Sequence, residues 1–201
     1  MMGWMKEELR EALSRRQKRH IVDPSRTPSA VLIPVYHQEG EYYLLFTKRS
    51  ETVKNHKGQI SFPGGAYEDG DGSLLNTALR ESVEEIGLRV GDVEVLGELD
   101  DTVARVSNYI ISPFVGFIPW PYRFKVDKRE IERIIEVPIS ALLDKNCLRE
   151  ETGVEDGETV GQYFYHYRGD VIWGATARIL TQFLDILRGV VGSVDLGCES
   201  E

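Results

Sequence analysis

Apolar residues along the chain follow two different spacings, and each spacing predicts one kind of secondary structure. Residues 30–36 and 42–47 are short apolar runs on either side of a polar Gln-Glu-Gly-Glu turn, which is typical of two paired strands. Runs of the same type predict further strands at 93–99, 109–118, 131–137, 162–167 and 171–173.

Other segments carry apolar residues at helical spacing. Residues 4–19 predict a charged amphipathic helix, and residues 175–187 predict a second amphipathic helix that contributes to the core. A short helical turn is expected at 140–143. Strands and helices mixed in this way predict an α/β fold with helices on both faces of a mixed sheet.

A further helix, which precedes Gly87, has two unlike faces. At about 100° per residue, one stripe holds its apolar side chains: Leu75, Leu79, Val83 and Ile86. Nearly opposite lie its carboxylates: Glu81, Glu84 and Glu85. We expect the apolar stripe to pack on a sheet and the acidic side to look into a cleft. Asp71 or Ser73 can cap the start of this helix, and Gly87 is expected to end it.

The length of the chain, 201 residues, suits one domain with a proper core. Residues 1–27 are expected to form the N-terminal helix and a connector, and residues 28–191 the domain itself. The last segment, 192–201, is expected to be a mobile tail. The sequence leaves the oligomeric state open, a homodimer included.

Charge and cysteine content argue against a nucleic-acid-binding protein and against a disulfide-rich one. A net charge of −9 argues against nucleic acid as a general partner, because phosphate backbones need basic surfaces. The two cysteines are far apart and predict neither a disulfide framework nor a metal site, which fits a cytoplasmic location. No apolar run approaches the roughly 18 residues of a membrane span, so no membrane partner is expected.

The three carboxylates of the acidic helix face need an explanation. Glu81, Glu84 and Glu85 stand at i, i+3 and i+4, where like charges repel and weaken a helix. One interpretation is a plain solvated face. The other is a hard divalent cation, since Mg²⁺ takes oxygen ligands and bridges carboxylates to substrate phosphates. On this second interpretation Glu81 and Glu85 grip one ion, and Glu84 serves a second ion or orients a water.

Residues 80–88 read Arg-Glu-Ser-Val-Glu-Glu-Ile-Gly-Leu and resemble the second half of the Nudix box, Arg-Glu-aliphatic-x-Glu-Glu-x-Gly-aliphatic. Two departures stand out. Position 82 is Ser where the pattern has an aliphatic residue. The loop glycine, Gly65, lies fifteen residues before the arginine instead of fourteen, and Gly72, beside Asp71, stands where the pattern has a glutamate. A one-residue insertion in the loop accounts for the second departure.

That insertion resembles one branch of the family, the coenzyme A pyrophosphatases. An upstream run that reaches from Thr47 to Gly65 resembles the motif this branch carries before its box, with Lys54 where the branch has Arg. Arg49, Lys54 and His56 gather positive charge in this run, as a substrate with a pyrophosphate and an extra 3′-phosphate would need. For His56, a structural hydrogen bond is an equal alternative.

The resemblance implies an α/β/α sandwich and a Mg²⁺- or Mn²⁺-dependent hydrolase. It adds the backbone carbonyl of Gly64 to the expected metal ligands Glu81, Glu84 and Glu85, while Gly64 and Gly65 let the backbone approach the phosphates. Arg80 is expected to hold the carboxylates by ion pairs. The general base stays open among five acids: Glu130, Glu132, Glu136, Glu155 and Glu158.

The substrate implied by the resemblance is coenzyme A or a derivative of it. Hydrolysis of its pyrophosphate bond would give 3′-phosphoadenosine 5′-phosphate and 4′-phosphopantetheine or its acyl form. One alternative is a Nudix enzyme for another nucleoside diphosphate compound, such as ADP-ribose or a dinucleoside polyphosphate. A second alternative, from another class, is a Nudix-fold binding or regulatory module without turnover.

Overall fold

The computed structural model describes residues 4–51, 57–104, 106–155 and 158–195. Its first half contains α1 (Trp4–Arg15), β1 (Thr27–Gln38), β2 (Glu41–Arg49), β3 (Ile60–Ser61), β4 (Gly64–Ala66), α2 (Leu74–Ile86) and the short 3₁₀ helix η1 (Val90–Asp92). The second half contains β5 (Glu94–Glu98), β6 (Thr102–Ala104), β7 (Tyr109–Phe117), β8 (Ile131–Pro138), α3 (Ile139–Leu143), β9 (Leu148–Glu155), β10 (Glu158–Tyr167), β11 (Asp170–Ile172) and α4 (Gly174–Asp195).

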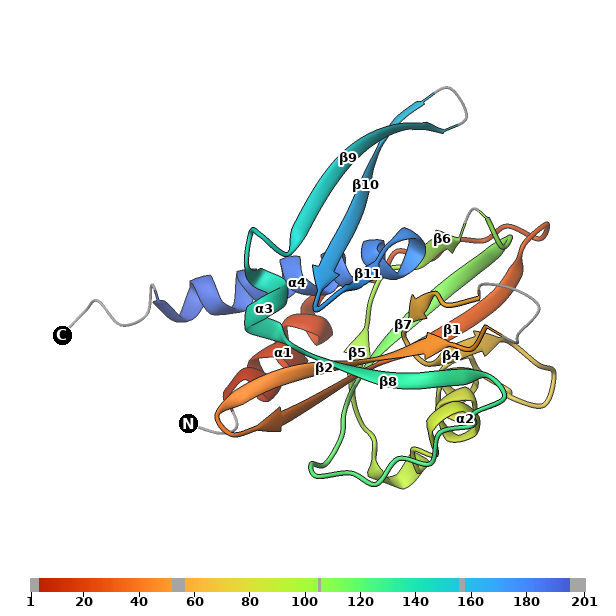
Figure 1. The fold of residues 1–201 in the computed structure, drawn as a ribbon, viewed down its shortest axis with the longest axis horizontal. Coiled ribbons are helices and arrows are strands. Elements are labelled where there is room, and N and C mark those ends of the chain that lie inside the picture. Colours follow the sequence, from red (N-terminus) through yellow and green to blue (C-terminus); the bar gives the residue numbers. More distant parts are fainter. Residues whose placement is uncertain (1–3, 52–56, 105, 156–157, 196–201) are drawn as a thin grey trace.

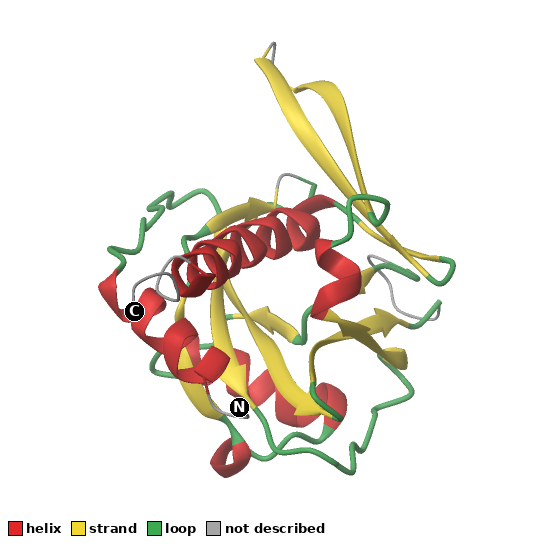
Figure 2. Cartoon of the chain, turned by 90° about the vertical axis from the view of Figure 1, so that its left-hand side faces the viewer, coloured by secondary structure: helices red, strands yellow, loops and turns green. Residues whose placement is uncertain are grey.

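One mixed sheet contains β1 to β8, and β1 lies at its centre (Figure 1). Strand β1 runs parallel to β7, with Ala30 opposite Ser112, and antiparallel to β2, with Val35 opposite Leu44. The short strand β4 pairs with the first part of β1, while β8 pairs with the outer side of β2. Strands β9, β10 and β11 form a second, antiparallel sheet, from which the β9–β10 hairpin projects away from the body (Figures 1 and 2).

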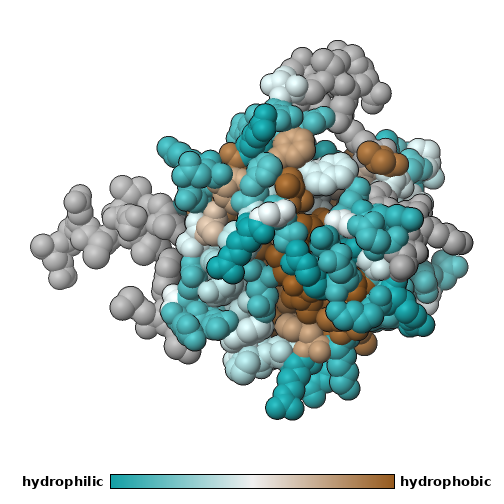
Figure 3. Space-filling view, in the orientation of Figure 1, coloured by the Kyte–Doolittle hydropathy of each residue, from teal (hydrophilic) through white to brown (hydrophobic). Residues whose placement is uncertain are grey.

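Helices cover both faces of the mixed sheet. Successive side chains of a strand point to opposite faces, so one strand contributes side chains to two cores. Leu44 and Phe46 of β2 belong to a core with α1 and α4, whereas Leu45 belongs to a second core with α2. Phe124 and Ile134 pack against this second core, and Figure 3 shows apolar residues gathered in the middle of the face in view, with hydrophilic residues around them. These layers confirm the predicted α/β/α sandwich with a mixed sheet.

Helix α1 packs into the same core as α4. Its apolar side, Met5, Leu9 and Leu13, is buried, and Leu9 is 0% exposed. The helix ends at Arg15, earlier than predicted, because the following residues are bonded to the β5–β6 region instead: Lys18 Nζ lies 3.1 Å from an oxygen of the buried Asp101.

All seven predicted strands are present, with their ends shifted by a few residues. Strand β9 was not predicted, because its sequence is rich in charged residues and lacks an apolar run. Helix α4 continues to Asp195, beyond the expected end of the domain at residue 191, and residues 196–201 of the expected tail lie outside the described residues. Among the described helices, none is long and apolar enough to cross a membrane.

The packing of α1 generates a stability prediction. Replacing Leu9 with Ala leaves a cavity between α1 and α4, so we expect the free energy of unfolding to fall by about 2–5 kcal/mol. Thermal and urea unfolding would measure the loss. The exposed Glu11, on the same helix, supplies the control: Glu11→Ala should change stability by less than about 1 kcal/mol, and an equally small effect of Leu9→Ala would contradict the packing described here.

Candidate active site

Helix α2 begins and ends where the sequence predicts. The Ser73 hydroxyl accepts a hydrogen bond from the backbone N–H of Asn76 at 3.2 Å, which is an N-cap. Gly87 adopts a left-handed conformation with φ 68° and donates its N–H to the carbonyl of Val83. These caps fix the start, the end and therefore the rotation of the helix that carries the three glutamates.

The apolar face of α2 differs from the predicted stripe at Val83, and the buried side also includes Ser82. Val83, predicted to be in the apolar stripe, is 41% exposed. Ser82, the departure from the aliphatic pattern, is instead fully buried, and its hydroxyl donates to the carbonyl of Ala78 at 2.7 Å. A serine is tolerated there because its polar group is satisfied within the helix. Helix α2 is covered by β1 and β4 of the sheet, and the segment after β7 covers its last turn, where the N–H of Lys125 donates to the carbonyl of Ile86 and that of Asp127 to the carbonyl of Glu85.

Glu85 is the buried member of the acidic group, with 3% of its surface exposed. One carboxylate oxygen accepts a hydrogen bond from the backbone N–H of Gly64 at 3.3 Å, and the other lies 3.6 Å from Nη1 of Arg49. Burial outweighs these favourable contacts and raises the pKa of Glu85 to about 8. The contacts with Gly64 and Arg49 thus do not fully stabilise the charged form of this buried carboxyl.

Glu81 and Glu84 share the guanidinium of Arg80. Arg80 Nη1 donates to Glu81 Oε1 at 2.9 Å and to Glu84 Oε2 at 3.1 Å. The Glu81 side chain is 16% exposed, and burial raises its pKa against the opposing effect of the Arg80 charge. The Glu84 side chain is 58% exposed and points further toward solvent. Glu81 and Glu85 are therefore the pair that faces the loop.

Asp71 is the partner of Arg80 that the sequence analysis missed. Its two oxygens accept from Arg80 Nε at 2.7 Å and from Nη2 at 3.1 Å, and they also accept from the Thr77 hydroxyl and the Glu68 N–H. The Arg80 hydrogen bond, together with the others, holds the pKa of Asp71 well below its ordinary value. The available signal was its place beside Gly72, the position where the Nudix pattern expects a glutamate.

Gly64 and Gly65 lie in β4 against the start of β1 and against α2 (Figure 1). A Cβ on Gly64 would lie 2.2 Å from the carbonyl oxygen of Ala30, so the strand contact itself excludes a side chain. A Cβ on Gly65 would lie 2.3 Å from Glu81 Oε1. The absence of a side chain at Gly65 therefore leaves room for the Glu81 carboxylate beside β4. This role is more specific than allowing a tight turn.

The remaining predicted residues fall in different places. Arg49 is the last residue of β2, and its Nη1 lies 3.6 Å from the Glu85 carboxylate. Lys54 and His56 lie outside the described residues. Among the five candidate bases, Glu130 is near enough to Glu81 and Glu85 for its charge to help raise their pKa values.

The other four candidates have different surroundings. Glu132 and Glu136 lie on β8, where Glu132 pairs with Lys48 at 3.7 Å. Glu155 and Glu158 stand opposite each other at the far end of the projecting hairpin (Figure 1). The general base stays a prediction among these five residues, of which Glu130 is the one whose charge acts on Glu81 and Glu85.

The donor set suits a hard divalent cation. Glu81 and Glu85 supply carboxylate oxygens at the β4 loop, and Mg²⁺ is commonly held by one or two carboxylates plus substrate phosphates and water. As they stand, the described residues contain no cluster of three or more acidic, His or Cys side chains close enough to hold an ion alone. A third ligand would come from Glu84, from the carbonyl of Gly64 or from the substrate, and the ligand roles stay predictions.

The family follows from comparison with known proteins. The NUDIX domain model matches residues 26–146. The chain belongs to the Nudix hydrolase family. It is 36% identical over 154 residues to the "Uncharacterized Nudix hydrolase NudL" of Photorhabdus laumondii, covering 77% of this chain and 81% of that protein. It is 34% identical to the protein of the same name from Citrobacter koseri, over 79% of this chain and 81% of the relative.

A solved structure supports the fold. A MutT/nudix family protein from Enterococcus faecalis matches with a TM-score of 0.55, over 94% of this chain and 73% of that chain, at 12% sequence identity. Membership of the family makes this chain a hydrolase of a pyrophosphate bond, and divalent metal is typical of such enzymes.

The contact between Gly65 and Glu81 yields the first site prediction. Gly65→Ala should push the Glu81 carboxylate out of place and lower kcat by about 10²-fold, because small misplacements of catalytic groups cost that much. Steady-state hydrolysis assays would measure it. Gly70→Ala is the matched control in the same loop, since a Cβ there meets nothing within 4 Å; equal losses in both variants would refute the role of the close approach.

The burial of Glu85 yields a pH prediction for the metal-free protein. Its folded-state pKa of about 8 lies above the unfolded value, so its contribution to stability is present at acid pH and is lost as pH rises from about 4.5 to 8. Glu85→Gln should remove this pH-dependent loss in the free energy of unfolding, which is on the order of a few kcal/mol. Melting curves with chelator present should show the variant gaining on wild type as pH rises. A gap that stays constant between pH 5 and 9 would contradict this.

Proposed function

We propose that this Nudix hydrolase cleaves the pyrophosphate bond of coenzyme A or one of its derivatives. The observation that carries the proposal is Arg49, from the upstream run that resembles the coenzyme A branch. Its Nη1 lies 3.6 Å from Glu85, and its Nε is buried without a hydrogen-bond partner among the described residues. A buried guanidinium donor left unpaired is costly, and a phosphate oxygen is the acceptor that satisfies it best.

Each residue then has a part in the reaction. Glu81 and Glu85 would hold the ion, which when bound neutralises phosphate charge and makes water more nucleophilic. Arg80 keeps Glu81 and Glu84 in position and is itself fixed by Asp71. Arg49 orients the pyrophosphate beside the β4 glycines.

In the reaction, water adds to one phosphorus atom as the bridging P–O bond breaks, and its proton passes to the general base. Glu130 is favoured for that role by its place near the pair Glu81 and Glu85. The two products carry one phosphate each at the former bridge, namely 3′-phosphoadenosine 5′-phosphate and 4′-phosphopantetheine.

Product analysis by mass spectrometry tests the proposal. The protein would be incubated with Mg²⁺ or Mn²⁺ and, in parallel, with coenzyme A, dephospho-coenzyme A and ADP-ribose. We expect 4′-phosphopantetheine to form fastest from coenzyme A, with Glu81→Gln and Glu85→Gln slower by orders of magnitude but still folded. Cleavage of ADP-ribose alone would overturn the substrate, and turnover of none would favour a binding module.

Arg49 gives a sharper test of the same proposal. Arg49→Ala should raise KM for coenzyme A by about 10- to 100-fold, the range expected for a lost charge-assisted hydrogen bond. Arg49→Lys should recover only part of this, because it restores the charge without the guanidinium fork. Arg89→Ala is the control, since Arg89 is exposed and pairs with Asp92 beyond the end of α2. Unchanged KM in Arg49→Ala would count against phosphate binding by this residue.

A further inference from the structure

Trp173 presents an aromatic ring to solvent. Its neighbour Ile172 is 1% exposed and belongs to the core, whereas Trp173 is 43% exposed. The other large apolar side chains that are strongly exposed in the described residues are valines. None of the ring pairs found in that part of the chain includes Trp173. The indole is therefore a free aromatic surface.

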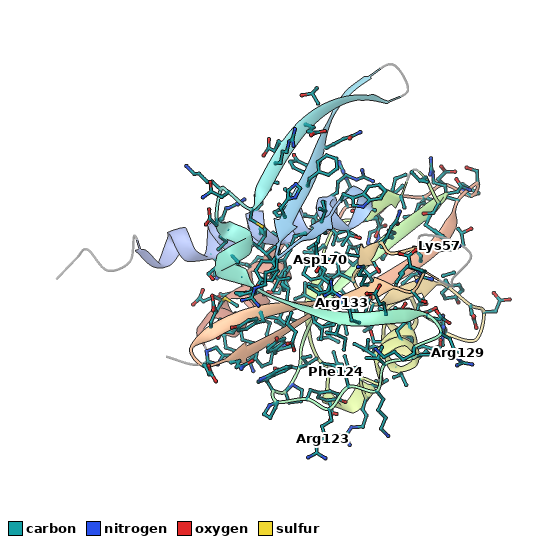
Figure 4. The ribbon with its side chains drawn as sticks, in the orientation of Figure 1. Lys57, Arg123, Phe124, Arg129, Arg133 and Asp170 are labelled. Carbon is teal, nitrogen blue, oxygen red and sulfur yellow. The ribbon has the colours of Figure 1, made fainter. Side chains whose placement is uncertain are left out.

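The backbone around Trp173 is held in place from both sides. Before it, β11 pairs with β10, and Asp170 accepts from Arg133 Nη2 at 2.7 and 2.6 Å, a contact whose two residues are labelled in Figure 4. After it, Gly174 turns the chain with φ 67° into α4, and Arg178 donates to the carbonyl of Val103 at 2.7 Å. The exposure of the indole is thus a property of an anchored segment.

The strand before Trp173 contacts the strand that leads into the candidate active site. Strand β11 packs against β3, and β3 leads through Phe62 and Pro63 into Gly64. An extended residue spans about 3.3–3.6 Å, so Ser61 is at most about 10 Å from Gly64. A nucleotide whose phosphates sit at the β4 glycines and Arg49 can therefore bring its base to the neighbourhood of β11.

We propose that Trp173 is the platform on which the purine ring of the substrate stacks, so that the adenine half of the substrate lies along β3 and β11. This inference rests on the proposed function for the identity of the substrate. Aromatic side chains bind nucleobases through their π-faces whatever the base, and an exposed indole carried on an anchored segment loses little freedom on binding. Trp173 is then a specificity-determining residue of the purine side, separate from the groups that act on the pyrophosphate.

Fluorescence tests the proposal on ligands that contain no pyrophosphate bond. Trp4→Phe with Trp120→Phe leaves Trp173 as the single indole of the chain. Adding 3′-phosphoadenosine 5′-phosphate should quench its emission, and 4′-phosphopantetheine should not. By calorimetry, Trp173→Ala should raise the Kd of the adenine ligand about tenfold or more, and Trp173→Phe should stay near wild type. Val90→Ala, another exposed apolar residue, should change nothing.

The outcomes separate the inference from the proposed function. An unchanged Kd in Trp173→Ala would overturn the stacking role, and so would equal weakening of both half-substrates, since the indole would then only support the fold. Quenching by the adenine ligand without hydrolysis of coenzyme A would keep the purine platform and overturn the proposed reaction. Hydrolysis of coenzyme A with the same KM in wild type and Trp173→Ala would do the reverse.

Discussion

Glu85 is an ionisable residue with 3% of its surface exposed, and the groups around it partly offset the cost of burying its charge. The Gly64 N–H and the Arg49 guanidinium face it, yet burial still favours its protonated form. An apolar residue there would make a more stable helix. The site therefore stores unfavourable electrostatic energy, which a cation can release on binding.

The charges around Glu85 form a network with an uneven balance. Arg80 is bonded to Asp71, Glu81 and Glu84, and Arg49 lies 3.6 Å from Glu85. Carboxylates outnumber guanidinium groups, so the network attracts positive charge while remaining rigid. Asp71 anchors one end of Arg80, which leaves Nη1 directed at the glutamates. The loop before α2 thus contributes to the electrostatics as well as to the turn.

Local patterns in the sequence predicted much of this arrangement, and longer-range contacts account for the rest. Ser73 and Gly87 were predictable as helix ends because capping depends on neighbouring backbone groups. The exposure of Val83 and the burial of Ser82 depend on which loop covers α2, and helical periodicity contains no such information. Asp71 escaped prediction because its partner is nine residues away, across a turn whose geometry the pattern leaves undefined.

The packing of α1 against α4 has a consequence for how the molecule is made. Leu9 is covered by residues more than 160 positions later in the chain. During synthesis β5 can cover part of the apolar side of α1, including Leu13, but the part that packs on α4 has no native cover until α4 leaves the ribosome. Contacts of such high sequence separation slow folding and leave sticky surface exposed meanwhile.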